Sequence, residues 1–101
     1  ILKLHSNRLL DLDENIFINL SNLIVLYLNQ NFLNSLESKN LFRNLLNIEI
    51  IQLRSNNLTR IPERLFYNLS KLNRLILRNN KISRINLPNL KSFLTLDLEN
   101  N

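Results

Sequence analysis

Leucine and isoleucine recur along the chain at fixed spacings, and segment 72–82 shows the pattern most completely. It reads Leu-x-x-Leu-x-Leu-x-x-Asn-x-Ile, and segments 23–33 and 48–58 repeat it with leucine or isoleucine at the apolar positions. Partial copies lie at both ends. The asparagines at the polar position of the pattern are Asn7, Asn31, Asn56, Asn80 and Asn101. The steps between them are 24, 25, 24 and 21 residues, a period typical of stacked repeats.

The two leucines of each Leu-x-Leu step point the same way in a strand, so both enter a core while the residue between them faces outward. A single repeat has nothing to close that core. Stacking places each short strand beside the next and turns isolated leucines into continuous columns. The pattern therefore predicts a parallel sheet built from one strand per repeat.

On these motifs the chain resembles the leucine-rich repeat family, in the 24-residue form of extracellular animal proteins such as Toll-like receptor ectodomains, Slit and chaoptin-type adhesion proteins. The resemblance implies an α/β repeat fold, a right-handed leucine-rich-repeat solenoid with a concave parallel β-sheet and a mostly irregular convex side. It also implies a protein-binding module of a cell-surface receptor.

The repeated asparagine follows each strand, where the chain turns inward. Its side chain has donors and an acceptor for backbone groups of the bend and of the neighbouring repeat. We therefore expect a buried asparagine ladder. Glycine is absent, so turns that need a positive φ are expected to use asparagine.

The chain divides into a partial repeat 1–22, repeats 23–47, 48–71 and 72–92, and a partial repeat 93–101. Because neither a capping unit nor a cysteine-rich cap is seen, we interpret the chain as an internal fragment of a longer protein. The leucines of the two end strands should then face solvent, and they are Leu2, Leu4, Leu96 and Leu98.

Phe17, Phe42 and Phe66 occupy equivalent places in the first three repeats and are expected to stack beneath the convex side. The convex segments predict turns and brief helical or 3₁₀ pieces. Repeat 72–92 omits the phenylalanine, and a local change of curvature should follow.

Enzyme activity is not expected. The chain has no cysteine and one histidine, and its carboxylates are spread over different repeats. Asp11, Asp13 and Glu14 form the densest group, and we interpret it as a solvated turn in preference to a calcium site. No metal or cofactor site is predicted.

Residues between the buried leucines should form a row on the concave face in each repeat, with same-column residues side by side. This places an apolar patch beside arginines, which is typical of a protein-binding surface. The alternative is that β-branched residues merely suit strands. The candidate ligand-binding residues are Val25, Tyr27, Ile50, Gln52, Arg54, Arg74, Ile76 and Arg78.

The expected partner is a protein ligand or co-receptor. The net charge of +5 also admits a polyanion, although Asp97 and Glu99 interrupt the basic surface. No apolar run is long enough to insert into a membrane, and nothing in the pattern indicates an oligomeric state. A structural spacer, a homophilic adhesion segment and an intracellular scaffold of the same fold are the alternatives.

Three tripeptides fit the acceptor motif for N-linked glycans, at Asn19, Asn57 and Asn68. Asn19 and Asn68 each lie 12 residues after a repeated asparagine and should occupy equivalent surface sites. A glycan on any of the three would place the chain at the cell surface or outside the cell, whereas bare asparagines would favour the cytoplasm.

Overall fold

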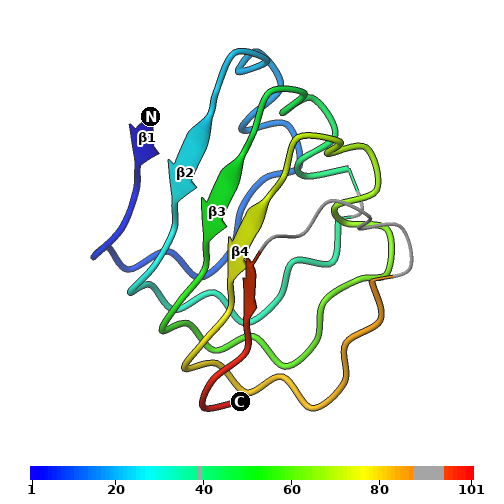
Figure 1. The fold of residues 1–101 in the computed structure, drawn as a ribbon. Helices are drawn as coiled ribbons and strands as arrows, with labels where there is room; N and C mark the ends of the chain where they lie inside the picture. Colours follow the sequence, from blue (N-terminus) through cyan, green and yellow to red (C-terminus); the bar gives the residue numbers. More distant parts are fainter. Residues whose placement is uncertain (39, 88–94) are drawn as a thin grey trace.

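The computed structural model describes residues 1–38, 40–87 and 95–101, and the strands within these residues form one sheet of five. All neighbouring strands are parallel and follow one another in chain order, so each coil of the chain adds one strand beside the last (Figure 1). The strands are β1 (Leu2–Lys3), β2 (Val25–Tyr27), β3 (Ile50–Gln52), β4 (Arg74–Ile76) and β5 (Thr95–Asp97). The predicted repeat solenoid is confirmed, while its handedness stays a prediction.

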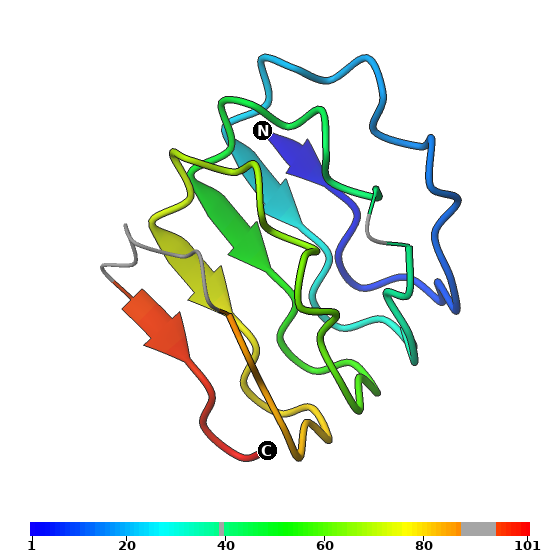
Figure 2. The same ribbon diagram turned by 90° about the vertical axis from the view of Figure 1, so that its right-hand side faces the viewer.

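The central residue of each inner strand points into the core. Leu26 lies opposite Ile51, Ile51 lies opposite Leu75, and all three are fully buried. Figure 2 shows the strands side by side, with the loops of the opposite side turned toward the viewer. The alternation predicted for the Leu-x-Leu step is therefore confirmed, and it fixes which residues face outward.

The side opposite the sheet consists of turns. In the first coil, Ile16 N–H donates to Asp13 O and Ile18 N–H donates to Asn15 O, each at 3.1 Å. These bonds start at every second residue, whereas a 3₁₀ helix requires them at consecutive residues. No helix occurs within residues 1–38, 40–87 and 95–101, so the expected helical pieces are wrong for this part of the chain.

The predicted phenylalanine stack is confirmed. The rings of Phe17 and Phe42 stack with centroids 5.9 Å apart, and those of Phe42 and Phe66 stack at 5.7 Å with an interplanar angle of 9°. All three side chains are buried. Because the same ring occupies the same place in successive coils, the stack joins three repeats on the side away from the sheet.

The buried asparagine ladder is confirmed for the three inner residues, whereas the end residues Asn7 and Asn101 are exposed, because a neighbouring coil covers each of them on one side only. Asn56 Nδ2 donates to the carbonyl oxygens of Leu53 and Leu28 at 3.0 Å each, and its Oδ1 accepts from Leu33 N–H at 3.1 Å. Asn31 and Asn80 bond in the same way and are buried like Asn56. Each inner asparagine thus ties its own bend to the preceding coil and satisfies backbone groups that would otherwise lack partners.

Asparagine does not supply every positive φ, which corrects the sequence-based expectation. The residue before each ladder asparagine has a φ between 55° and 58°, and these residues are Ser6, Gln30, Ser55, Asn79 and Asn100. A bond to the next coil holds this conformation: Gln30 N–H donates to Arg54 O at 2.9 Å, and Ser55 N–H donates to Arg78 O at 3.0 Å. Stacking therefore imposes the left-handed turn even on residues that disfavour it.

The leucines of the end strands are less exposed than expected. Leu2, Leu4 and Leu98 are half-buried against the core, and Leu96 is 38% exposed. Each has a neighbouring coil on one side, which covers part of the side chain. The change of curvature expected in repeat 72–92 falls partly on residues 88–92, which lie outside the described residues. The repeat boundaries stay predictions.

Candidate functional site

The outward residues of the sheet form columns, as the strand register requires. Ile50 lies opposite Val25 on one side and Arg74 on the other. In the next column Gln52 lies between Tyr27 and Ile76, and Ile76 in turn faces Asp97. The structure therefore brings together the candidate residues that the sequence placed on this face, which we call the sheet face.

The apolar part of the sheet face is centred on β3 and β4. Tyr27, Ile50 and Ile76 are half-buried, so each offers part of its side chain to a partner. Val25 differs from the prediction, because it is only 9% exposed. Val25 lies in register with the half-buried Ile50 but offers little of its own surface to a partner.

The arginines of the sheet face differ in whether they form ion pairs. Arg54 and Arg74 are exposed, and neither takes part in an ion pair within the described residues. Arg78 contacts Glu99 at 2.8 Å and Asp97 at 3.9 Å, so the end strand neutralises it. The cations left for a partner on this side of the patch are Arg54 and Arg74.

The N-terminal edge of the face carries an aromatic contact. The rings of His5 and Tyr27 meet edge to face with centroids 6.3 Å apart, and His5 Nδ1 lies 3.1 Å from Ser6 Oγ. These contacts restrict Tyr27 before any partner binds. A restricted aromatic side chain loses less conformational entropy on binding.

The three glycan acceptor motifs lie in different surroundings. Asn19 and Asn68 are exposed and occupy equivalent places after the phenylalanine stack. Asn57 is half-buried beside the ladder. The equivalence predicted for the first two sites is therefore seen in the structure.

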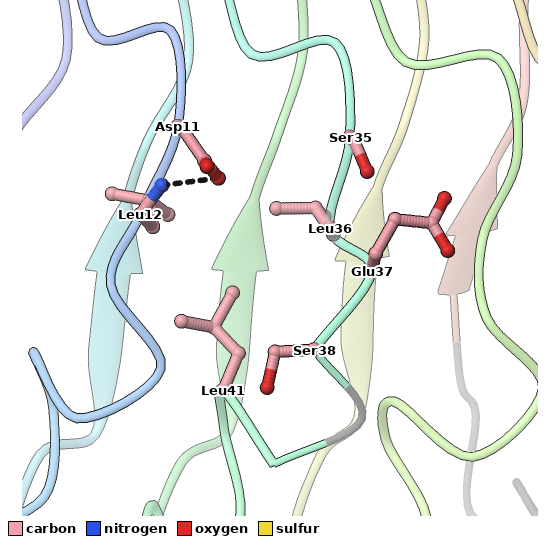
Figure 3. A pocket seen from close by; sticks show the side chains of 7 residues that line it. All are labelled: Asp11, Leu12, Ser35, Leu36, Glu37, Ser38 and Leu41. Atoms are coloured by element: carbon pink, nitrogen blue, oxygen red, sulfur yellow. Dashed lines mark hydrogen bonds between the residues drawn. The ribbon is translucent and has the colours of Figure 1, made fainter.

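Sequence reasoning missed a hollow between the first two coils, about 230 Å³ in volume (Figure 3). Its lining comes from Asp11, Leu12, Ser35, Leu36, Glu37, Ser38 and Leu41. Asp11 and Ser35 each follow a ladder asparagine by four residues, but Arg60 and Arg84 do so too, so this offset does not locate the hollow.

The carboxylates at this hollow accept hydrogen bonds from other groups of the protein. Asp11 Oδ1 accepts from Leu12 N–H at 2.7 Å, and Glu37 Oε1 accepts from Arg60 Nε at 2.8 Å. The nearby Glu14 Oε2 accepts from Ser38 Oγ at 3.0 Å, and Asp13 Oδ1 accepts from Asn15 N–H. Within the described ranges, no three His, Cys, Asp or Glu side chains gather as a metal site would require.

The same described part of the chain contains no helix with the length and hydropathy that a membrane span needs.

A comparison with protein families adds a direct assignment. A family model described as leucine rich repeat matches residues 46–101, more than half of the chain. The chain therefore belongs to the leucine-rich repeat family. Domains of this family generally serve as protein-interaction modules and are typically non-enzymatic. No curated protein matches the chain.

Proposed function

We propose that the chain binds a protein ligand on its sheet face, as part of the ectodomain of a Toll-like or adhesion-type cell-surface receptor. The observation that carries this proposal is that half-exposed Ile50 and Ile76 lie beside Arg54 and Arg74, which form no ion pair within the described residues. Apolar surface edged by arginine is the composition expected of a binding hot spot.

The charges define the kind of protein surface that fits. A matching partner presents apolar side chains opposite Ile50 and Ile76, with carboxylates beside them that reach Arg54 and Arg74. Arginine can bond a carboxylate through two parallel N–H groups, which fixes orientation as well as charge. A partner with carboxylates farther toward β5 would meet Asp97 and Glu99 and be repelled.

A polyanion is the less favoured ligand. Tracking a chain of phosphates or sulfates requires cations spaced along the whole face. Here Arg78 is already paired with Asp97 and Glu99, so the positive surface ends at β4. The exposed acceptor motifs at Asn19 and Asn68 support the extracellular location over a cytoplasmic scaffold.

Site-specific photocrosslinking tests the proposal in the full-length protein on its native cells. A photoreactive amino acid at position 50 should capture a protein partner, and Arg74→Glu in the same molecule should abolish the capture. The control places the photoreactive group at Leu46, which is 54% exposed but lies in a turn before β3. Equal capture from both positions would overturn the assignment of the sheet face.

The alternative of a spacer without a ligand makes a different prediction in that experiment. Position 50 would then capture no partner, although the photoreactive protein folds and reaches the cell surface. Labelling of intact cells with an antibody to the chain checks the proposed location separately, since a cytoplasmic scaffold would be stained only after permeabilisation.

A further inference from the structure

Three asparagines occupy the same place in successive coils, two residues after each stacked phenylalanine. They are Asn19, Asn44 and Asn68. Asn44 is half-buried, and its Nδ2 donates to Ile18 O at 2.8 Å, which ties the second coil to the first. Asn19 and Asn68 are exposed and make no such side-chain bond within the described residues. Their amide nitrogens are accessible at the surface.

Among these three equivalent positions, the acceptor motif for an N-linked glycan occurs only where the asparagine is exposed. Asn19 and Asn68 are each followed two residues later by an exposed serine, Ser21 and Ser70. Asn44 has Leu46 at that position instead. A glycan replaces one hydrogen of Nδ2 and adds bulk, so it suits an exposed amide and would disturb one that bonds the neighbouring coil.

The third acceptor motif is less suited to carry a sugar. Asn57 is half-buried between ladder residue Asn56 and the fully buried Leu58. Leu58 N–H donates to Asn80 Oδ1 at 3.1 Å, so the backbone of this motif is part of the ladder. A bulky group on Asn57 would press against the bend that the ladder holds.

Asn68 also has a hollow beside it. The hollow measures about 200 Å³, and Asn40, Arg64, Tyr67 and Asn68 line it. It lies against two equivalent turns of neighbouring coils, closed by the bonds Arg43 N–H to Asn40 O and Tyr67 N–H to Arg64 O, both 3.1 Å. The Tyr67 side chain is 57% exposed, so this hollow combines an open aromatic ring with polar side chains.

We infer that Asn68 carries an N-linked oligosaccharide whose first sugar lies in this hollow against the ring of Tyr67. A sugar ring has an apolar face that covers an aromatic side chain and hydroxyl and amide groups that bond Arg64 and Asn40. The inference rests on the proposed extracellular location, because the modification occurs in the secretory pathway.

The modification is a group transfer. Asn68 Nδ2 attacks the anomeric carbon of a lipid-linked diphosphate oligosaccharide, and a new C–N bond forms as the bond from that carbon to the diphosphate oxygen breaks. The lipid diphosphate leaves with the electron pair of the broken bond. The proton lost from Nδ2 passes to a base of the membrane-bound transferase that catalyses the step.

The test uses the full chain, secreted from eukaryotic cells behind an added signal peptide. Peptide mapping after N-glycosidase treatment should show Asn68 converted to aspartate and Asn57 unchanged. Tyr27 and Tyr67 are the only tyrosines, so nitration then reports the position of the sugar. Tyr67 should react several-fold more slowly in the glycosylated protein than in the enzymatically deglycosylated one, while Tyr27 should react equally in both.

Two variants serve as matched controls. Asn68→Gln and Ser70→Ala each remove the acceptor motif at an exposed position, and both should nitrate at Tyr67 as fast as the deglycosylated protein. An unmodified Asn68 in the secreted chain, or equal nitration of Tyr67 with and without the glycan, would overturn the inference. Because secretion is imposed, these outcomes are independent of the native location and of the ligand on the sheet face.

Discussion

The inward positions of the coils hold nearly the same residue in every repeat, whereas the outward positions change at every step. Leu26, Ile51 and Leu75 are in register in the core, while their outward neighbours are Tyr27, Gln52 and Ile76. An inward side chain must pack against similar residues on both sides, so its size and polarity are constrained. An outward side chain need only suit a strand, and it is therefore the position at which binding can be specified.

The largest difference in stability is expected between a glutamate introduced at an inward position and one introduced at an outward position of the same coil. Leu53→Glu should unfold the chain, because it buries a carboxylate among leucines at a cost of more than about 4 kcal/mol. Ile50→Glu should keep the melting temperature near that of the wild type and abolish partner capture, since Ile50 is only half-buried. Thermal unfolding followed by circular dichroism measures the first effect. Equal loss of structure in both variants would contradict the assignment of the two faces.

The aromatic residues on the side away from the sheet allow a second comparison of a buried with an exposed position. Phe42→Ala should lower the free energy of unfolding by about 3–5 kcal/mol, because Phe42 is fully buried between two rings. Tyr67→Ala removes an exposed ring and should change stability by no more than about 0.5 kcal/mol. Denaturant titration of both variants gives the values. Similar losses would mean that the stack contributes little beyond ordinary surface packing.

The neighbouring residues Asn56 and Asn57 allow a third comparison, between a buried ladder asparagine and a half-buried one. Asn56→Ala should cost roughly 1–3 kcal/mol, since it leaves the buried N–H of Leu33 without its acceptor. The carbonyls of Leu28 and Leu53 each lose one of two donors and keep the bonds from Asn31 Nδ2 and Asn80 Nδ2. Asn57→Ala should cost less than about 0.5 kcal/mol, because the Asn57 side chain makes no hydrogen bond within the described residues. Hydrogen exchange at Leu33 N–H should accelerate in the first variant alone, and acceleration in both would contradict the assignment of this bond to the ladder.

The sequence predicts the inward half of the molecule well, because similar residues recur at each buried position in successive repeats. The ladder residue Asn56, the stacked Phe42 and the strand residue Ile51 all lie where their repeated spacing puts them. The residues of the outward half differ from repeat to repeat, so no second copy supports the prediction at any one position. Val25 is buried although its register neighbour Ile50 is half-buried, and the pairing of Arg78 depends on two acidic residues in the following coil.

The positive φ at Gln30 and Ser55 shows a further limit of residue preferences. Neither residue favours the left-handed region, and both adopt it because a carbonyl of the next coil accepts their N–H. The hollow beside Tyr67 is likewise formed by turns of two coils, so its place depends on how they stack.

The smallest effect is expected at an outward ion pair that joins two coils. Arg60 Nε donates to Glu37 Oε1 at 2.8 Å, and a second guanidinium nitrogen contacts the other carboxylate oxygen. Hydrogen bonding to Arg60 holds the pKa of the Glu37 carboxyl below its ordinary value of 4.5. The pair therefore stabilises the fold above about pH 4.5, and this contribution is lost as the pH falls through the lower folded pKa.

Glu37→Gln should accordingly be slightly less stable than the wild type at pH 7, with the difference vanishing in acid. Both side chains are largely exposed, so 1 M salt should also shrink the difference at pH 7. Denaturant midpoints of the two proteins between pH 2 and pH 7 measure it. A difference that persists at pH 2 would show that Glu37 stabilises the outward surface by packing and not by charge. Packing would then stabilise the outward surface, as it stabilises the core.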